Sequence, residues 1–299
     1  MDSYREADTR PIDVRIMAVY DELTASERRL ASVVLEAQAN LSSFTAGELA
    51  ERAKTSNATA ARFFKRLGYP SYSEARLHAR RAEGWGSPLY ELTGIGRERV
   101  AQGNFGLHVA QDLQNLTRTA EMLKEQDLAE AIRILVAARK VWVLGFRNSM
   151  ALASYARALL IHVKPDVPLL PLAGMSLGED LASLSPEDAL LVVGFRRRPA
   201  VLREVLTLAA EVGTPSVLIA DMTAARTAQL ATVTLRSHNR GHSLFDSYAA
   251  PMSLINYICS AAGQEIGEPA VERLSRIETL HSRLTSLVVP GHVRQSSKK

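Results

Sequence analysis

The second half of the chain alternates short apolar runs with helical patterns, and this alternation constrains the fold more than any other feature. After Lys140 five β-rich runs follow one another: VWVLGF, VPLLPLA, ALLVVGF, PSVLIAD and TVTLR. Helical patterns separate most of them, near residues 150–163, 176–184, 199–212 and 223–229. Strands that alternate with helices form right-handed βαβ units, so the pattern predicts a parallel sheet covered by helices on both faces.

Two of the predicted strands end in the same Gly-Phe-Arg sequence, and the residues that follow suit anion binding. Parallel sheets bind ligands beyond the carboxyl ends of their strands. Arginine grips phosphate or carboxylate in a bidentate manner, and we expect Ser149 near a helix start, where unpaired N–H groups and the helix dipole favour an anion. The predicted anion-binding residues are Arg147, Ser149, Arg196, Arg197 and Arg198. The alternative is that the arginines are solvated or form ion pairs across a dimer interface.

Residues 11–82 have helical patterns only, and the helix starts are marked by their caps. T-A-S-E at 24–27 and T-A-G-E at 45–48 are capping boxes. Lys54 and Thr55 predict a tight turn, after which Ser56 can cap a third helix, NATAARFFKRL, that ends at Gly68. Two short helices joined by so tight a turn predict a helix-turn-helix, and with it an all-α head separate from the α/β half.

The third helix has an inward face of Ala60, Phe63 and Leu67 and an opposite face of small and basic residues. Small residues allow a close approach to base edges, Asn pairs with adenine, Arg with guanine, and Lys with phosphate. The predicted DNA-binding residues are Thr55, Ser56, Asn57, Thr59, Arg62, Lys65 and Arg66. The alternative is a solvated amphipathic helix in an ordinary bundle. Eight basic residues against one acidic residue between 52 and 81 favour DNA.

Length and composition agree with a two-domain globular protein. The chain has 299 residues, 46% of them hydrophobic, and a formal charge of +4 that permits a nucleic-acid partner. One cysteine, a polar N-terminus and the lack of an apolar run near ~20 residues predict a cytoplasmic protein with no membrane contact.

Glycine-rich stretches and helical patterns predict how the chain is divided into domains. Residues 83–106 are rich in glycine and predict a linker. Residues 107–138 predict helix, with apolar residues at helical spacing: Val109, Leu113, Leu116, Ala120 and Leu123. Helical patterns near 246–263 and 268–287 end the chain. We expect a helix-turn-helix domain at 1–84, a linker and connecting helix at 85–128, an α/β domain with the candidate anion-binding residues at 129–270, and a C-terminal helix and tail at 271–299.

No motif predicts catalysis, a metal or a cofactor. An aldose–ketose isomerase needs a general base, and the candidates near strand ends are Glu179, Asp180, His238 and His242. None lies in a recognisable catalytic motif, and the two histidines share a glycine-containing loop with no third ligand apparent. Cys259 stands in an apolar run and is expected in the core.

The segment FTAGELAERAKTSNATAARFFKRLGYPSYSEARLHARR resembles the N-terminal domain of the RpiR/MurR-type transcriptional regulators. The S-x-x-T-x-x-R-F-x-x-x-LG pattern of the family's recognition helix and its end is matched by Ser56, Thr59, Arg62, Phe63, Leu67 and Gly68. The sequence departs from the family at Ala60, where a larger aliphatic residue is frequent, and Phe64 is expected to fill that space.

Residues 130–270 resemble the SIS (sugar isomerase) domain, a parallel five-stranded αβα sandwich. The first strand end fits its G-x-x-x-S pattern through Ser149, whereas R-R-R-P replaces the usual Ser/Thr-rich loop after the second. SLFDSYAAPMSLIN resembles the late helix of such regulators, with Asp246 and Ser247 facing the pocket. The resemblance implies a homodimer or homotetramer that binds a double-stranded DNA operator under the control of a small anionic metabolite, such as a phosphorylated sugar or related acid. The alternatives are a phosphosugar isomerase with a fused helical domain and a non-catalytic SIS module that regulates a protein partner.

Overall fold

The computed structural model describes residues 12–37, 41, 44–81, 104–195, 198–224, 227–242 and 245–288. These residues form two compact units. The first joins the part of the chain up to Met122 with Ala220–Gln229 and Arg236–Ala250, and the second joins Leu123–Ile219, Leu230–Leu235 and the part from Pro251 onward. The predicted linker at 83–106 lies outside the described residues except for its last three, and so do residues 289–299 of the predicted C-terminal helix and tail. The predicted domain limits stay a prediction.

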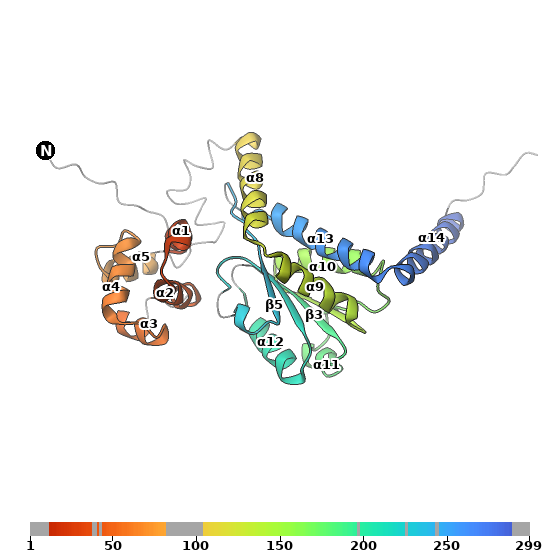
Figure 1. Ribbon diagram of the computed structural model, residues 1–299, viewed down its shortest axis with the longest axis horizontal. Helices are drawn as coiled ribbons and strands as arrows, with labels where there is room; N and C mark the ends of the chain where they lie inside the picture. Colours follow the sequence, from red (N-terminus) through yellow and green to blue (C-terminus); the bar gives the residue numbers. More distant parts are fainter. Residues whose placement is uncertain are drawn as a thin grey trace, which may run out of the picture. The chain divides into compact units, whose positions relative to one another are not determined.

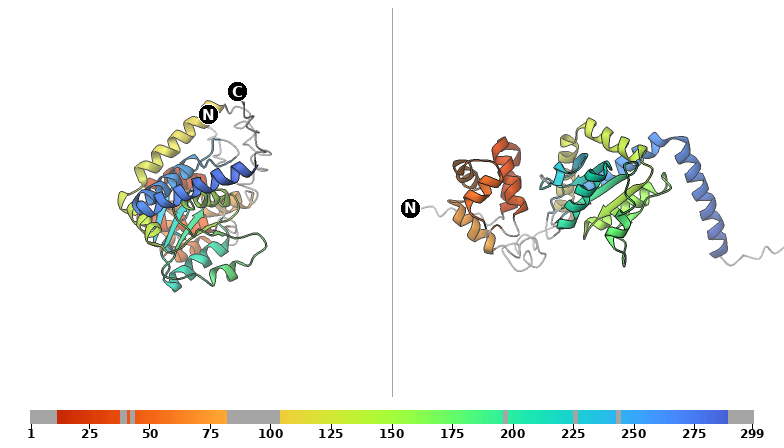
Figure 2. Two further views of the ribbon diagram at one scale, coloured as in Figure 1. Left: turned by 90° about the vertical axis from the view of Figure 1, so that its right-hand side faces the viewer. Right: turned by 90° about the horizontal axis from the view of Figure 1, so that it is seen from below.

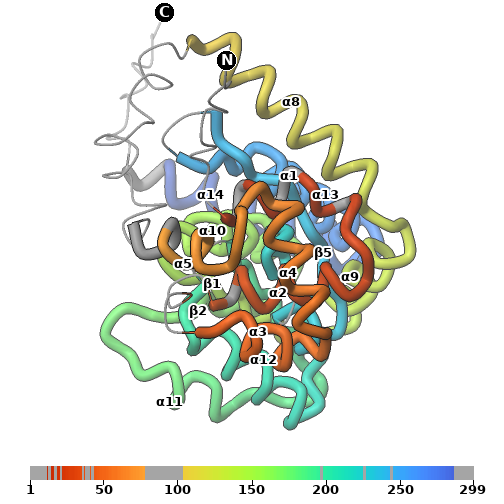
Figure 3. Tube along the Cα trace, turned by 90° about the vertical axis from the view of Figure 1, so that its left-hand side faces the viewer, coloured from red at the N-terminus to blue at the C-terminus, as the bar shows by residue number. Residues whose placement is uncertain are grey.

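The head consists of short helices, traced in red and orange in Figures 1 and 3. They are α1 (Ile12–Val19), the 3-10 turn η1 (Tyr20–Glu22), α2 (Ala25–Glu36), α3 (Ala46–Arg52), α4 (Asn57–Arg66) and α5 (Tyr72–Arg81). Both predicted capping boxes are present: Thr24 and Thr45 each accept a hydrogen bond from the backbone of the glutamate three residues on, and that glutamate accepts one in return. The helix-turn-helix prediction is confirmed.

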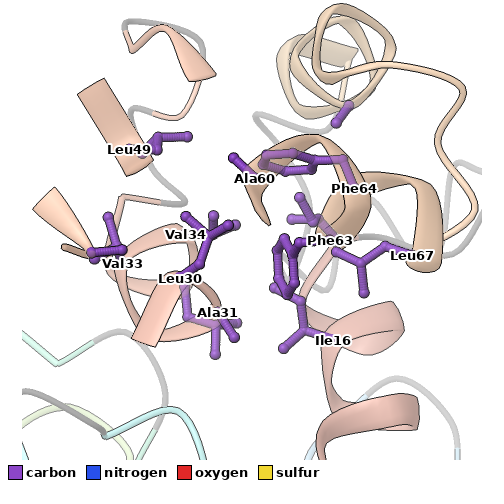
Figure 4. Close-up of a cluster of buried hydrophobic side chains, with 14 of the residues drawn as sticks. Ile16, Leu30, Ala31, Val33, Val34, Leu49, Ala60, Phe63, Phe64 and Leu67 are labelled. Carbon is purple, nitrogen blue, oxygen red and sulfur yellow. The ribbon is translucent and has the colours of Figure 1, made fainter. Parts of the chain in front are cut away.

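The core of the head is apolar and includes the inward face predicted for α4 (Figure 4). Ala60 and Phe63 are fully buried and Leu67 nearly so. Phe64, expected to fill the space beside Ala60, is also fully buried, with its ring 5.4 Å from that of Phe63 and 4.9 Å from that of Tyr72. The Tyr72 hydroxyl reaches the carbonyls of Leu41 and Phe44. Burial raises the pKa of Tyr72 to about 12.

The predicted helical stretch at 107–138 is two helices, α8 (Phe105–Met122) and α9 (Glu125–Ala137). The break falls at Lys124, whose extended backbone makes it the N-cap of α9. On α8 the two buried residues are polar, Asn115 and Thr119, whereas the apolar Leu113 is 60% exposed. The spacing of apolar residues predicted the helix but not the side that packs.

The sheet is parallel where its pairing is described, with strand order β2-β1-β3-β4-β5. The strands are β1 (Val141–Gly145), β2 (Leu169–Leu170), β3 (Ala189–Gly194), β4 (Ser216–Ala220) and β5 (Val233–Arg236). Every residue of β1, β3 and β4 is buried, whereas buried and half-buried residues alternate along the edge strand β5. Continuous apolar strands are typical of a sheet that is covered on both faces, and the predicted fold class is confirmed.

Helices cover the sheet on both sides, with α10 (Ser149–Leu160) and α12 (Ala200–Val212) on opposite faces (Figure 1). This follows from right-handed crossovers, because β1 leads to β2 in one direction and β3 leads to β4 in the other. The short α11 (Leu177–Leu181) precedes β3. Of the helical stretch predicted near 223–229, the described residues show a 3-10 turn, Thr227–Gln229, while Ala225 and Arg226 lie outside the described residues.

The last two helices are α13 (Ala249–Ile266) and α14 (Glu268–Val288). α13 packs on α10, where the Cys259 thiol lies 4.0 Å from the Ala156 carbonyl. Cys259 is only 3% exposed, which confirms it as a core residue, and this burial raises the pKa of its thiol to about 12. Gly267, with a φ of +70°, separates the two helices, and α14 extends away from the sheet (Figure 2).

Candidate functional sites

The turn between α3 and α4 is held by the backbone and by one distant arginine. Lys54 adopts a left-handed conformation with a φ of 50°. The Thr55 N–H donates to the Ala50 carbonyl at 2.8 Å, and Thr55 is half-buried. Arg29 of α2 donates from Nε to the Ala53 carbonyl at 3.2 Å, which satisfies an end of α3. Neither Lys54's conformation nor Arg29's role is visible in the local sequence.

The start of α4 is fixed by its cap. Ser56 Oγ accepts a hydrogen bond from the Thr59 N–H at 3.2 Å and lies 3.0 Å from the Thr59 hydroxyl. This confirms Ser56 as the N-cap. Because both hydroxyls are engaged in the cap, they set the position of the helix start, and their predicted contact with DNA stays a prediction.

The outward face of α4 carries the residues expected to meet DNA. Asn57, Arg62 and Lys65 are exposed, and so are the two alanines between them on this face, Ala58 and Ala61. A row of small side chains between one amide and two cations suits the major groove. The structure therefore brings these predicted residues together on one surface.

Arg66 differs from the other predicted DNA-binding residues because it is paired within the head. Its guanidinium lies 3.2 Å from the Glu22 carboxylate and 3.6 Å from that of Glu27. An arginine held by two carboxylates has less charge to offer a phosphate. The contact of Arg66 with DNA stays a prediction, as do those of Arg62 and Lys65.

The far end of α4 is fixed by a residue that the sequence did not single out. Arg15 is buried, donates from Nη1 to the Leu67 carbonyl at 3.0 Å, and lies 4.0 Å from the ring centre of Tyr69. Gly68, with a φ of +83°, ends the helix as predicted. The arginine is 52 positions from its acceptor in the sequence, so no local signal could have identified it.

The two Gly-Phe-Arg strand ends lie side by side, because β1 pairs with β3 and Gly145 is in register with Val193. A Cβ added at Gly145 would lie 2.6 Å from the Ser149 carbonyl oxygen and 2.7 Å from the Ala153 Cβ. Only glycine fits here, where α10 turns back onto β1. Arg147, in the turn, is exposed and left-handed with a φ of 54°.

Ser149 joins the two strand ends by a buried hydrogen bond. Its hydroxyl accepts from the Phe195 N–H at 3.1 Å, and the residue is only 4% exposed. The expected unpaired N–H groups are not found here: those of Ser149, Met150 and Ala151 donate to carbonyls three residues back. Helix α10 therefore offers an anion less at its first turn than predicted, and a ligand would depend more on side chains.

The second strand end contributes one described arginine. Arg198 donates from Nη1 to the Gly194 carbonyl at 3.0 Å, so its side chain folds over the end of its own strand. Arg196 and Arg197 lie outside the described residues. Arg147 and Arg198 are thus at the carboxyl ends of adjacent strands, as expected from the parallel sheet.

Asp246 and Ser247 precede α13 rather than lying within a helix, because α13 begins at Ala249. The Ser247 N–H donates to the Asn239 carbonyl at 3.0 Å, and its hydroxyl accepts from the Ala249 N–H at 3.3 Å. Both residues belong to a segment of the first unit, whereas Arg147, Ser149 and Arg198 belong to the second. Their place in an effector site stays a prediction.

The described residues contain no group of three or more His, Cys, Asp and Glu side chains that could hold a metal ion. Of the candidate bases, Asp180 has one carboxylate oxygen, Oδ2, that is buried without a hydrogen-bond partner. Within the same part of the chain, no helix has the length and hydrophobicity to cross a membrane.

Comparison with known families matches both halves of the chain. Residues 12–82 match the helix-turn-helix domain of the rpiR family, and residues 134–261 match the SIS domain. An uncharacterized HTH-type transcriptional regulator of Haemophilus influenzae is 25% identical over 154 residues, 50% of this chain and 53% of that protein. The match thus spans about half of that relative. The HTH-type transcriptional regulator HexR of Pseudomonas aeruginosa is 22% identical over 67% of this chain and 69% of its own.

Solved structures share the fold. The sugar isomerase domain of an RpiR transcription factor from Sphaerobacter thermophilus is 23% identical with a TM-score of 0.54, over 57% of this chain and 96% of that one. The Vibrio vulnificus NanR protein complexed with ManNAc-6P is 18% identical with a TM-score of 0.54, over 91% and 98%. At these identities the likeness shows the fold alone. With a helix-turn-helix domain of the rpiR type followed by a SIS domain, the chain belongs to the RpiR/MurR-type regulator family.

Proposed function

We propose that the chain is a DNA-binding transcriptional regulator whose operator binding is controlled by an anionic metabolite in the SIS domain. The observation that carries the proposal is the exposed face of α4, with Asn57, Arg62 and Lys65 around two alanines. A recognition helix of this kind reads bases with Asn and Arg and holds the backbone with Lys. Such a regulator would act in the cytoplasm as a homodimer or homotetramer, since paired heads read paired half-sites.

The first experiment tests DNA recognition. Wild-type protein is used to enrich sites from a random duplex library, and variants are then titrated on the enriched duplex. Arg62→Ala should cost about 1–3 kcal/mol and relax selection at one base pair. Lys65→Ala should weaken every duplex alike and lower the salt slope by about one.

The control for both variants is Arg276→Ala, which removes an exposed arginine from α14. It should bind as the wild type does. Folded Arg62→Ala and Lys65→Ala proteins that bind the enriched duplex unchanged would exclude α4 as the recognition helix.

The effector is proposed to be an anion, either a phosphorylated sugar or a related acid. Arg147 is exposed at the carboxyl end of β1, next to the strand end that carries Arg198. That NanR is complexed with ManNAc-6P makes sugar phosphates the first class to test. Calorimetry against sugar phosphates and organic acids should identify the ligand, and that ligand should release DNA from the wild type.

Arg147→Ala should abolish this response and leave operator binding intact, whereas Arg276→Ala should respond normally. A neutral effector, or a normal response of Arg147→Ala, would show that the strand ends were misread. We also propose that the chain does not catalyse a reaction, because its relatives are named as regulators. Steady turnover of any sugar phosphate by the wild type would contradict this and favour the isomerase alternative.

A further inference from the structure

We propose that α8 pairs with α8 of a second copy of the chain, through an apolar stripe of Val109, Leu113, Leu116 and Ala120, here called the α8 seam. These residues follow one another at spacings of four, three and four. Alternating spacings of three and four are typical of the line along which one helix packs against another. The inference rests on the homodimer or homotetramer of the proposed function and names the surface through which two copies meet, and it can be tested without DNA or effector.

The structure turns the α8 seam to solvent. Leu113 is 60% exposed and Val109 37%, while Leu116 is half-buried and Ala120 exposed. At the start of the helix Phe105 is 79% exposed, which extends the apolar surface over most of α8, drawn in yellow in Figure 3. Large apolar side chains gathered on one exposed face mark an interaction surface.

The side of α8 that packs on its own chain is polar. Asn115 donates to the Arg240 carbonyl at 2.8 Å, and the Thr119 hydroxyl accepts from the His238 N–H at 2.9 Å. The same hydroxyl lies 3.3 Å from that of Ser237, which is fully buried. A surface helix normally buries its apolar face and exposes its polar one. Here the order is reversed, so the apolar face is the one left for another molecule to cover.

The charges on α8 favour a second copy as that molecule. In a two-fold interface both copies use the same patch, so a charge near its centre would face the same charge on the other copy and be repelled. The α8 seam carries no charge, and neither do the residues that flank it on its free side, Ala110 and Thr117. The nearest acid, Asp112, lies 3.2 Å from His108 on the other flank. Leu113 is at the middle of the helix, so a pair centred there would cover the whole seam.

The experiment measures the mass of the full chain by sedimentation in the absence of DNA. The wild type should have at least twice the 32.7 kDa of one chain. Leu113→Glu should raise the dissociation constant of the pair by about 100-fold or more, the effect of a charge at the centre of an interface. Gln114→Glu places the same charge on an exposed neighbour off the seam and should keep the wild-type mass.

A cross-linking experiment checks proximity directly. The single native thiol, Cys259, is buried, so an introduced cysteine would be the reactive one. Under a mild oxidant Leu113→Cys should form a disulfide-linked dimer, because a residue at the centre of the pair meets its own copy. Gln114→Cys should stay largely single.

Three results would overturn the proposal. The wild type could be a monomer at micromolar concentration. Leu113→Glu could keep the wild-type mass while Leu280→Glu on α14, another exposed apolar position, dissociates the pair, which would place the interface on α14. Leu113→Glu could also keep the wild-type mass but speed amide exchange in the head, which would show that the α8 seam is covered by the head of the same chain and not by a second copy. None of these depends on DNA binding, so each differs from a failure of the proposed function.

Discussion

Glu27 is the residue at which the cap of α2 and the basic end of α4 meet. Its carboxylate accepts hydrogen bonds from the Thr24 N–H and hydroxyl, both at 2.9 Å, and faces the Arg66 guanidinium at 3.6 Å. Burial alone would raise the pKa of Glu27. The two bonds from Thr24 and the charges of Arg66 and Arg62 outweigh burial, so the pKa lies below its usual value near 4.5.

This shift predicts an acid-sensitive head. A carboxyl group whose pKa is lower in the folded state stabilises that state above its unfolded pKa, and the gain is lost as the pH falls through the folded pKa. The free energy of opening of the head, measured by amide exchange in α2 and α4, should therefore fall between pH 6 and pH 3. Glu27→Gln should flatten this dependence, whereas Glu51→Gln, an exposed charge-matched control, should keep it. Equal slopes in the two variants would contradict the assignment.

The same network explains why single-residue roles were harder to predict than helix starts. A capping box spans four residues, so the pattern at Thr24 was sufficient to place it. Arg66 was predicted to hold phosphate because of its place on the helix. The ion pair with Glu22 was missed, because Glu22 is 44 positions away in the sequence and spacing gives no sign of it. The ion-pair partner of a long and flexible side chain depends on the tertiary fold.

The packing of helix on strand gives a prediction at the level of elements. Gly145→Ala should destabilise the sheet unit by about 1–3 kcal/mol or more, because the added methyl group would overlap the backbone of α10. The matched control is Gly178→Ala in α11, where the added Cβ would meet nothing closer than 3.7 Å. That variant should be neutral or gain about 0.5–1 kcal/mol from helix propensity. Urea unfolding followed by tryptophan fluorescence, to which the buried Trp142 contributes, compares them; similar midpoints would contradict the close approach.

Elements differ in how far the sequence predicts them. β1 and β3 were predicted because a strand buried on both faces is a continuous apolar run, which needs no knowledge of its neighbours. The side of α8 that packs against the chain was not predicted, because the polar Asn115 and Thr119 are buried there by hydrogen bonds to a segment more than a hundred residues later. Ser149 was placed correctly at a helix start, yet its bond to Phe195 depends on which strands are adjacent. The local sequence pattern predicts that an element forms, whereas the residues that it contacts depend on the tertiary fold.

At the scale of the whole molecule, charge is distributed unevenly. The formal net charge is only +4, but the stretch from 52 to 81 has eight basic residues and one acidic residue. In the proposed function this local charge concentrates the attraction to DNA in the head, where the predicted DNA-binding residues include only three cations, Arg62, Lys65 and Arg66. Because affinity from phosphate contacts falls steeply with salt, a single head would bind weakly at physiological ionic strength.

Pairing through the α8 seam would compensate for a weak single head, and this predicts how affinity depends on the number of half-sites. When one head of a pair is bound, the second binds at a high effective concentration, which can raise affinity by about 10²–10⁴ without any new contact. The wild type should therefore prefer a duplex with two half-sites over one with a single half-site by a factor in this range. Leu113→Glu should lose the preference and keep the single-site affinity, whereas Arg62→Ala should weaken binding to both duplexes. Titration of the two duplexes separates these cases, and a wild type that binds them equally would show that its heads act alone.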